Sequence, residues 1–180
     1  METYIALLRG INVSGQKKVP MAELRKILED EEMANIKTYI QSGNVIFKSE
    51  SNYIIALEKS IMQKIEKYFG FKVPVLVKKV SDIKMILAAN PFDNTEDLEH
   101  NRIYFVLLQT VPEILKVKEF ETEKFVNEAF KITDHCVYLS CKNGYGKAKL
   151  NNNLIERKLK VKATTRNYRT MKKLLELSED

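Results

Sequence analysis

LLRGINVSGQKKVP (Leu7–Pro20) and TYIQSGNVIF (Thr38–Phe47) each join an apolar run typical of a β-strand to a turn rich in Gly, Asn and Ser. The first turn is flanked by three basic residues, Arg9, Lys17 and Lys18. A turn that follows a strand and precedes a helix can present backbone N–H groups and a helix dipole to an anion. The first turn is therefore a candidate anion site, and the alternative is a turn that its glycines permit, with lysines that are simply solvated.

The residues around these two stretches predict the element order β-α-β-β-α-β. Pro20 suits the first turn of a helix, and Gly43 can supply the positive φ that a tight hairpin turn demands. The expected strands are Thr3–Leu8, Ile36–Ile40, Asn44–Lys48 and Val73–Lys79, and the expected helices are 20–31 and Ile54–Phe69. This order is that of a ferredoxin-like unit, in which the first and third strands are adjacent and antiparallel. The two turns should therefore lie close together, with Arg9 near Asn44.

The same order recurs in the second half of the chain. Phe92–Asn101 carries four acids and no base, and it follows a predicted helix, so we expect it to be a linker. The expected strands after it are Arg102–Gln109, Glu128–Thr133, Cys136–Cys141 and Val161–Ala163, with helices starting at Pro112, Lys149 and Thr165. The sequence thus predicts an α+β protein of two ferredoxin-like halves, 1–90 and 91–180. Residue identities scarcely repeat, so the inferred duplication is one of architecture.

Several motifs, taken in chain order, resemble those of a known bacterial family. LLRGINV-x-G, KVPMAEL, TYIQSGNVIF, NGYGKAKLNN-x-LIERKL and ATTRNYRT resemble the successive motifs of the domain-of-unknown-function 1697 family. The resemblance implies a family without an established substrate. Two positions depart from its usual pattern, because Ser14 stands in place of a Gly and Tyr168 in place of a Trp. Ser14 adds a hydroxyl and reduces backbone freedom at a turn.

Composition places the protein in the globular class. Its 180 residues are 44% hydrophobic, which is enough for a core of ordinary size. No apolar run approaches the roughly 20 residues of a membrane helix, and the first residues lack the pattern of a secretory signal. Two cysteines, Cys136 and Cys141, fit a reducing compartment and should be buried thiols on opposite faces of a strand. We expect a cytoplasmic protein, and the sequence leaves its oligomeric state open.

The positive charge is concentrated near the C-terminus. Lys147–Lys173 holds ten basic residues and one acid, Glu156, so this segment carries +9 and the rest of the chain −3 of the total of +6. A basic surface of this kind favours anionic partners. The charge therefore belongs to the expected C-terminal helices.

The second Gly-containing turn, Asn143–Lys147, has the Gly-Lys pair of a phosphate loop. Cys141 stands where the first Gly of that loop belongs, and Ala148 stands where a magnesium-binding Ser or Thr belongs. These differences disfavour a nucleoside triphosphatase, and they leave Lys147 and Lys149 as simple anion contacts.

Thr164–Thr170 predicts a capped helix with Arg166 and Arg169 on one face. Arginine suits carboxylate or phosphate, and the alternative is that these arginines pair with acids elsewhere in the fold. With the first turn and the hairpin, the candidate anion ligands are Arg9, Asn12, Ser14, Lys17, Ser42, Asn44, Lys147, Lys149, Arg166, Asn167 and Arg169. No nucleophile with its base and no metal-ligand set is recognisable, and His100 and His135 lack partners for either. Catalytic residues and cofactors stay unassigned.

Three functions fit these observations. The first is weak binding of a phosphate-bearing ligand, either a small molecule or nucleic acid, although no strand carries the aromatic pattern of RNA-recognition modules. The second is an enzyme in which Arg9, Asn12, Ser14, Ser42 and Asn44 converge on a small substrate. The third is a non-catalytic interaction protein that pairs through a sheet edge.

Overall fold

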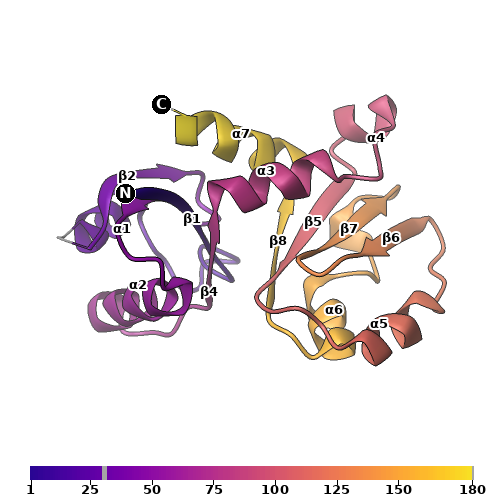
Figure 1. The fold of residues 1–180 in the computed structure, drawn as a ribbon, viewed down its shortest axis with the longest axis horizontal. Helices are drawn as coiled ribbons and strands as arrows, with labels where there is room; N and C mark the ends of the chain where they lie inside the picture. The colour runs from indigo at the N-terminus through magenta and orange to yellow at the C-terminus, as the bar shows by residue number, and fades with distance from the viewer. Residues whose placement is uncertain (30–31, 180) are drawn as a thin grey trace. The chain divides into compact units, whose positions relative to one another are not determined.

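The computed structural model describes residues 1–29 and 32–179, which form two compact units (Figure 1). The first unit comprises residues 1–84 and 173–180, and the second comprises 85–172. One boundary falls inside helix α3 (Val80–Ala88) and the other inside helix α7 (Tyr168–Glu179). The compact units and the division expected at residue 90 therefore differ over 85–90 and 173–180.

The first unit is built around a four-stranded antiparallel sheet with the strand order β2-β3-β1-β4. Its elements are β1 (Glu2–Leu8), α1 (Met21–Leu28), β2 (Ala34–Tyr39), β3 (Asn44–Ser49), α2 (Ile54–Phe69) and β4 (Val75–Lys79). Helix α2 ends where the sequence predicts, because Gly70 adopts a left-handed conformation with φ 79°.

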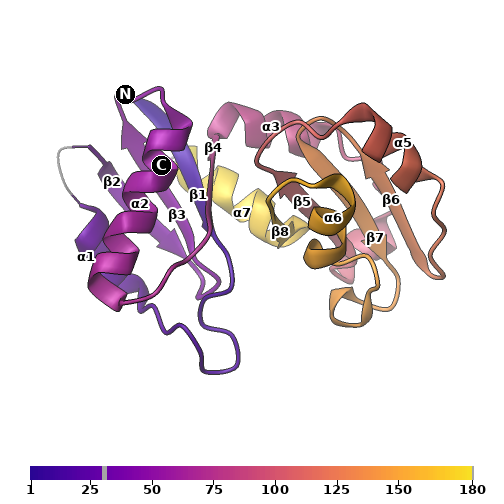
Figure 2. The same cartoon turned by 90° about the horizontal axis from the view of Figure 1, so that it is seen from below.

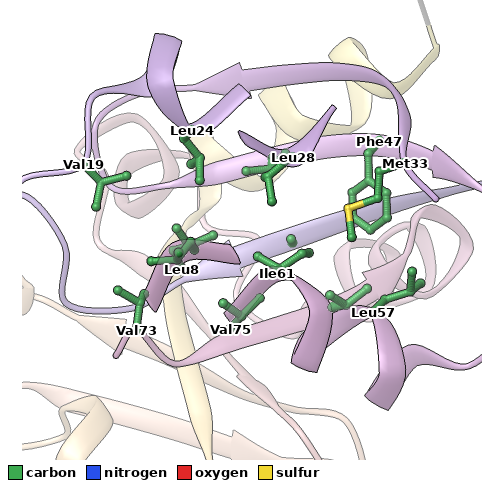
Figure 3. Close-up of a cluster of buried hydrophobic side chains, with 14 of the residues drawn as sticks. Leu8, Val19, Leu24, Leu28, Met33, Phe47, Leu57, Ile61, Val73 and Val75 are labelled. Atoms are coloured by element: carbon green, nitrogen blue, oxygen red, sulfur yellow. The ribbon is translucent and has the colours of Figure 1, made fainter. Parts of the chain in front are cut away.

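The core of the first unit lies between the sheet and helices α1 and α2 (Figure 3). In β1, alternate residues Tyr4, Ala6 and Leu8 face this core, as the period of two in a strand requires. Leu57, Ile61 and other α2 residues at helical spacing meet them and are fully buried. Thr3, Ile5 and Leu7 consequently lie on the opposite face of the sheet.

The second unit contains a second antiparallel sheet, with the strand order β6-β7-β5-β8. Its elements are α4 (Thr95–Glu99), β5 (Ile103–Leu108), α5 (Ile114–Glu121), β6 (Glu128–Ile132), β7 (Cys136–Cys141), a short 3₁₀ helix η1 (Tyr145–Lys147), α6 (Asn152–Leu159) and β8 (Ala163–Asn167). Helices α5 and α6 cover one face of this sheet (Figure 2).

The two cysteines of β7 are free and buried, as expected. Cys141 belongs to the core under α5 and α6, together with Val137 and Leu139, whereas Cys136 lies an odd number of residues away on the other face. Burial raises the pKa of the Cys141 thiol to about 12, so this thiol stays protonated at neutral pH.

Three local expectations are corrected. The acidic segment expected to be a linker contains helix α4, which Asn94 caps, and Arg102 pairs with both Glu96 and Asp97 at 3.2 Å. Helix α6 begins at Asn152, three residues later than expected.

The third correction concerns the end of the chain. Ala163–Asn167 is strand β8, so Arg166 lies in a strand and Arg169 lies in helix α7. The two arginines therefore do not share a helix face. Asn167, rather than a threonine, caps α7, because its Oδ1 accepts a hydrogen bond from the Thr170 N–H at 2.8 Å.

Candidate functional site

The loop after β1 and the turn between β2 and β3 lie together, as the sequence predicts. Leu7 and Asn44 are directly opposite each other in the β1–β3 pair, and the Leu8 N–H donates to the Gly43 carbonyl at 2.8 Å. Arg9 lies two residues after Leu7, and consecutive Cα atoms are about 3.8 Å apart, so the Cα atom of Arg9 cannot be far from that of Asn44. We call the loop Arg9–Lys18 and the turn Gln41–Asn44 the paired turns.

Asn12 fastens the paired turns to each other. Its Nδ2 donates to the carbonyls of Gln41 at 2.8 Å and Val19 at 3.0 Å, and its Oδ1 accepts from the Val19 N–H at 2.9 Å. Asn12 adopts φ 54°, a conformation that asparagine tolerates better than most residues. Its amide therefore serves the backbone of this loop.

Gly43 is the point of closest approach between the paired turns. It has φ 81°, and a Cβ placed on it would lie 2.6 Å from Ile11 Cδ1 and 2.8 Å from Leu8 Cβ. Ile11 is 2% exposed, so its side chain is packed into this contact. The Gly in the QSGN motif and the Ile in the RGIN motif are thus two sides of one packing interaction.

The remaining polar residues of the hairpin turn brace that turn. Asn44 is fully buried, and its Nδ2 donates to the Tyr39 carbonyl at 2.9 Å and to Ser42 Oγ at 3.1 Å. Both candidates in this turn therefore make hydrogen bonds within the protein itself.

Arg9, Ser14 and Lys17 differ from one another in their surroundings. Ser14 is exposed at the loop tip with φ 51°, and Gly15 follows with φ 74°, which makes a tight turn closed by the Val13–Gln16 bridge. Lys17 Nζ donates to the Lys72 carbonyl at 2.9 Å. The Arg9 N–H donates to the Pro74 carbonyl at 3.0 Å, and its side chain is half-buried.

In the second unit, an acidic side chain binds two backbone donors just after the Gly-containing turn. Glu128 accepts hydrogen bonds from the N–H groups of Lys149 at 2.9 Å and Leu150 at 2.8 Å. Asn151 Oδ1 accepts from the Leu154 N–H at 3.0 Å and caps α6. Within the turn, the N–H groups of Gly144 and Lys147 donate to the carbonyls of Cys141 and Gly144, so several donors in and after this turn are bound by the chain itself.

Tyr145 anchors the same turn through its hydroxyl group. The hydroxyl accepts from the Asn152 N–H at 2.8 Å and donates to Thr165 Oγ1 at 3.1 Å, while Thr165 donates to Asn152 Oδ1 at 2.8 Å. The Tyr145 ring stacks on Tyr104 with 4.7 Å between ring centroids. Neither Glu128 nor Tyr145 is a candidate from the sequence, because both act across long sequence separations.

The C-terminal candidates serve separate purposes. Arg166 is 8% exposed in β8, where burial lowers its pKa to about 10, and its Nη1 donates to the Thr165 carbonyl at 2.9 Å. Arg169 Nη2 contacts the Glu99 carbonyl. Asn167 caps α7 as described above. The structure does not gather these three side chains into one cluster within the second unit.

Five exposed basic residues lie in α6 or within a few positions of its ends in the chain, and we call them the basic strip: Lys147, Lys149, Arg157, Lys160 and Lys162. Their side chains have neither ion pairs nor hydrogen bonds within the described chain. Other cations of the C-terminal segment are engaged, since Lys158 pairs with Glu123 and Lys173 pairs with Glu176. Lys147 and Lys149 also line a cavity of about 260 Å³ beside Glu128.

The first unit has a larger cavity that the sequence did not reveal. It measures about 450 Å³ and lies beside the first sheet, next to the C-terminal end of α7. Residues from three strands, the end of α1 and α7 line it: Thr3, Glu29, Asn35, Ile36, Lys37, Ile46, Phe47, Lys48, Leu177 and Ser178.

The fold defines the class as an α+β protein with two separate four-stranded antiparallel sheets. None of the helices in residues 1–29 and 32–179 is long and apolar enough to cross a membrane. The family model described as "Protein of unknown function (DUF1697)" matches residues 1–138, so the chain belongs to this family, as its motifs suggest. The motifs between residues 143 and 170 lie beyond the matched range.

The structure is similar to that of the conserved bacterial protein SP0830 from Streptococcus pneumoniae. The TM-score is 0.76 at 23% sequence identity, and the match covers 98% of each chain. This similarity extends through the C-terminal region and supports the fold alone. No curated protein matches the chain by sequence.

Proposed function

We propose that this protein binds a phosphate-bearing polyanion, a nucleic acid strand, weakly and without sequence preference along the basic strip. The observation that supports this proposal is the set of five exposed cations on and beside α6 that have no partner in the described chain. Unpaired surface lysines and arginines interact with phosphates and release the counterions that surround them.

The geometry of α6 suits contact with several phosphates. A helix of eight residues is about 12 Å long, and each strand of a duplex carries one charge per roughly 3.4 Å of helix axis. Arg157 lies within the helix, Lys147 and Lys149 precede it in the chain, and Lys160 and Lys162 follow it, so the cations occur before, in and after α6. The strands lack the aromatic pattern of RNA-recognition modules, and the proposed binding is therefore to the phosphate backbone without base readout.

We also assign each half to the ferredoxin-like class. Both sheets follow a β-α-β-β-α-β order, and each places its first strand between its third and fourth strands. RNA-recognition modules share this architecture, which is an argument by analogy, so the charge distribution supports the function more directly. A cytoplasmic location agrees with this proposal.

The interpretation of the paired turns as an enzyme site receives less support. Asn12 and Asn44 direct their amide groups at backbone carbonyls, and Ser42 accepts from Asn44. These side chains stabilise the loop conformation. Catalysis requires polar groups that converge on a substrate, and these groups are directed at the protein's own backbone and side chains instead.

The test is fluorescence anisotropy with labelled single-stranded and duplex 30-mers at several salt concentrations. Arg157→Gln/Lys160→Gln/Lys162→Gln should reduce the slope of log affinity against log salt by about 2–3, since each phosphate contact contributes about 0.7–0.9. The matched control is Lys26→Gln/Lys59→Gln/Lys67→Gln, which removes the same charge from exposed helix positions of the first unit. Equal slopes for both triple variants, or absence of binding at low salt, would contradict the proposal.

A further inference from the structure

The cavity beside the first sheet is lined by both apolar and polar residues. Its sheet residues Thr3, Ile46 and Lys48 lie on the face opposite the core, because Tyr4 and Phe47 beside them face α1 and α2. Ile46 is 3% exposed and supplies the apolar lining together with Leu177 of α7, whereas the side chain of Ile36 packs against the core on the other face. A volume of about 450 Å³ falls within the roughly 300–1,000 Å³ that small-molecule sites occupy.

Two lysines line this cavity, and they are not equivalent. Lys37 Nζ donates to the Leu177 carbonyl at 3.2 Å, so it caps the last turn of α7, where carbonyl groups lack helical partners. Lys48 is half-buried in β3, an interior strand, and has no ion pair or side-chain hydrogen bond with any residue of the described chain. Lys79 of β4, by contrast, has an acidic partner, because its Nζ lies 3.7 Å from Glu2 Oε2.

A cationic side chain beside apolar lining favours an anion with an apolar body. Lys48 is half-buried, and its ammonium group has no carboxylate partner in the described chain. Glu29 also lines the cavity, so the formal charges of the described lining residues, two lysines and one acid, sum to +1. That balance suits a monoanion better than a phosphate dianion, which Glu29 would repel more strongly. The hydroxyl of Thr3 and the amide of Asn35 are further polar groups of the lining.

We propose that this cavity binds a small carboxylic acid with an apolar body, whose carboxylate pairs with Lys48 and whose body packs on Ile46 and Leu177. This site is distinct from the basic strip in both position and ligand, since it takes a compact amphipathic anion and the strip takes a polyanion. The residues of α7 that contribute a wall, Leu177 and Ser178, come from the last part of the chain.

The test uses protein labelled at the isoleucine δ1 methyl groups and titrated with hexanoate, hexylammonium or 1-hexanol. Hexanoate should shift the methyl resonance of Ile46, whereas Ile155 in the second unit serves as an internal reference. Hexylammonium should produce no saturable shift, and hexanol should bind at least fivefold more weakly than hexanoate. Equal responses to all three probes, no response to hexanoate, or shifts confined to other isoleucines would overturn the proposal.

Variants of Lys48 separate the role of its charge from a structural role. Lys48→Gln should weaken hexanoate binding at least fivefold, and Lys48→Arg should retain binding because it keeps the charge. Lys26→Gln, a change at an exposed lysine of α1, is the control and should bind like the unmodified protein. If Lys48→Arg loses binding as fully as Lys48→Gln, or if both bind normally, Lys48 does not hold the carboxylate. Nucleic acid binding should be the same in all of these variants.

Discussion

The Gly-containing turns of the two units occupy comparable places near the ends of strands, yet different chemistry holds them. In the first unit, the Asn12 amide and the packing of Ile11 on Gly43 join two loops. In the second, the Glu128 carboxylate and the Tyr145 hydroxyl bind the turn. Similar element order therefore did not carry a similar site with it, and each unit has to be read from its own residues.

The charges of the two units also differ. Residues 1–84 with 173–180 carry 15 basic and 13 acidic residues, whereas residues 85–172 carry 15 and 11, which gives net charges of +2 and +4. The second unit's excess of positive charge includes the five exposed residues of the basic strip. In our two proposals, this difference directs a polyanion to the second unit and leaves the first for a compact ligand.

The largest expected effect on stability is that of Gly43→Ala. The new methyl group would meet Ile11 and Leu8 at less than 3.0 Å on a backbone with φ 81°, so we expect a loss of about 3 kcal/mol or more in unfolding free energy. Urea denaturation measures it. Gly70→Ala is the matched control, because Gly70 has φ 79° and a Cβ added there would meet nothing within 4 Å, and it should cost about 1 kcal/mol. Similar losses for both would mean that the contact with Ile11 is unimportant.

Asn12→Ala and Glu128→Ala compare the two turns directly. Each removes the acceptor or donors of at least two backbone hydrogen bonds, so each should lower the unfolding free energy by about 2 kcal/mol. Only Glu128→Ala should then be restabilised by sulfate, because it frees two N–H groups beside Lys147 and Lys149. Thermal unfolding with 0 and about 20 mM sulfate distinguishes them, and an equal sulfate effect on both variants would contradict this account.

Alkaline pH should destabilise the second unit through Cys141. Burial raises the pKa of this thiol from 9.0 to about 12, so its contribution to stability is full below pH 9 and is lost as pH rises towards 12. Between pH 7 and pH 10, the unmodified protein should lose about 1 kcal/mol more than Cys141→Ala does. Denaturant titrations of both proteins at the two pH values measure the difference, and parallel pH dependence would exclude the thiol as its source.

The smallest expected effect is a gain in stability from Ser14→Gly. Ser14 has φ 51°, where a side chain is unfavourable by about 1–2 kcal/mol, and glycine's greater freedom in the unfolded chain offsets part of that gain. A net increase of about 0.5 kcal/mol is expected from urea unfolding. Gln16→Gly, at a nearby position without a positive φ, should instead lower stability.

Much of the first unit is predictable from local pattern. The strand ending near Leu8, the positive φ of Gly43 and the end of α2 at Gly70 each follow from residue types within a few positions. The closeness of the paired turns follows from the expected pairing of the first and third strands. These features are accessible because they depend on periodicity and turn chemistry.

Other features are not accessible because they depend on distant residues. Glu128 binds N–H groups 21 and 22 positions later, and Lys37 binds a carbonyl 140 positions later. Thr164 and Thr165 are residues that favour a helix start, so the sequence predicts a cap at these positions. The true cap is Asn167, a residue type with the same preference, two positions after Thr165. The β-branched side chains of Thr164 and Thr165 suit the strand that pairs with β5.

The division of α7 between the units has a consequence for the order in which the protein is made. The first unit includes residues 173–180, yet 88 residues of the second unit lie between them and Lys84 in the chain. At roughly 5–20 residues per second, a ribosome needs roughly 4–18 s to synthesise that interval, whereas hairpins form within about 1–10 μs. During translation the first sheet is therefore present for seconds without the Leu177 carbonyl that receives Lys37. The half that begins first is completed last.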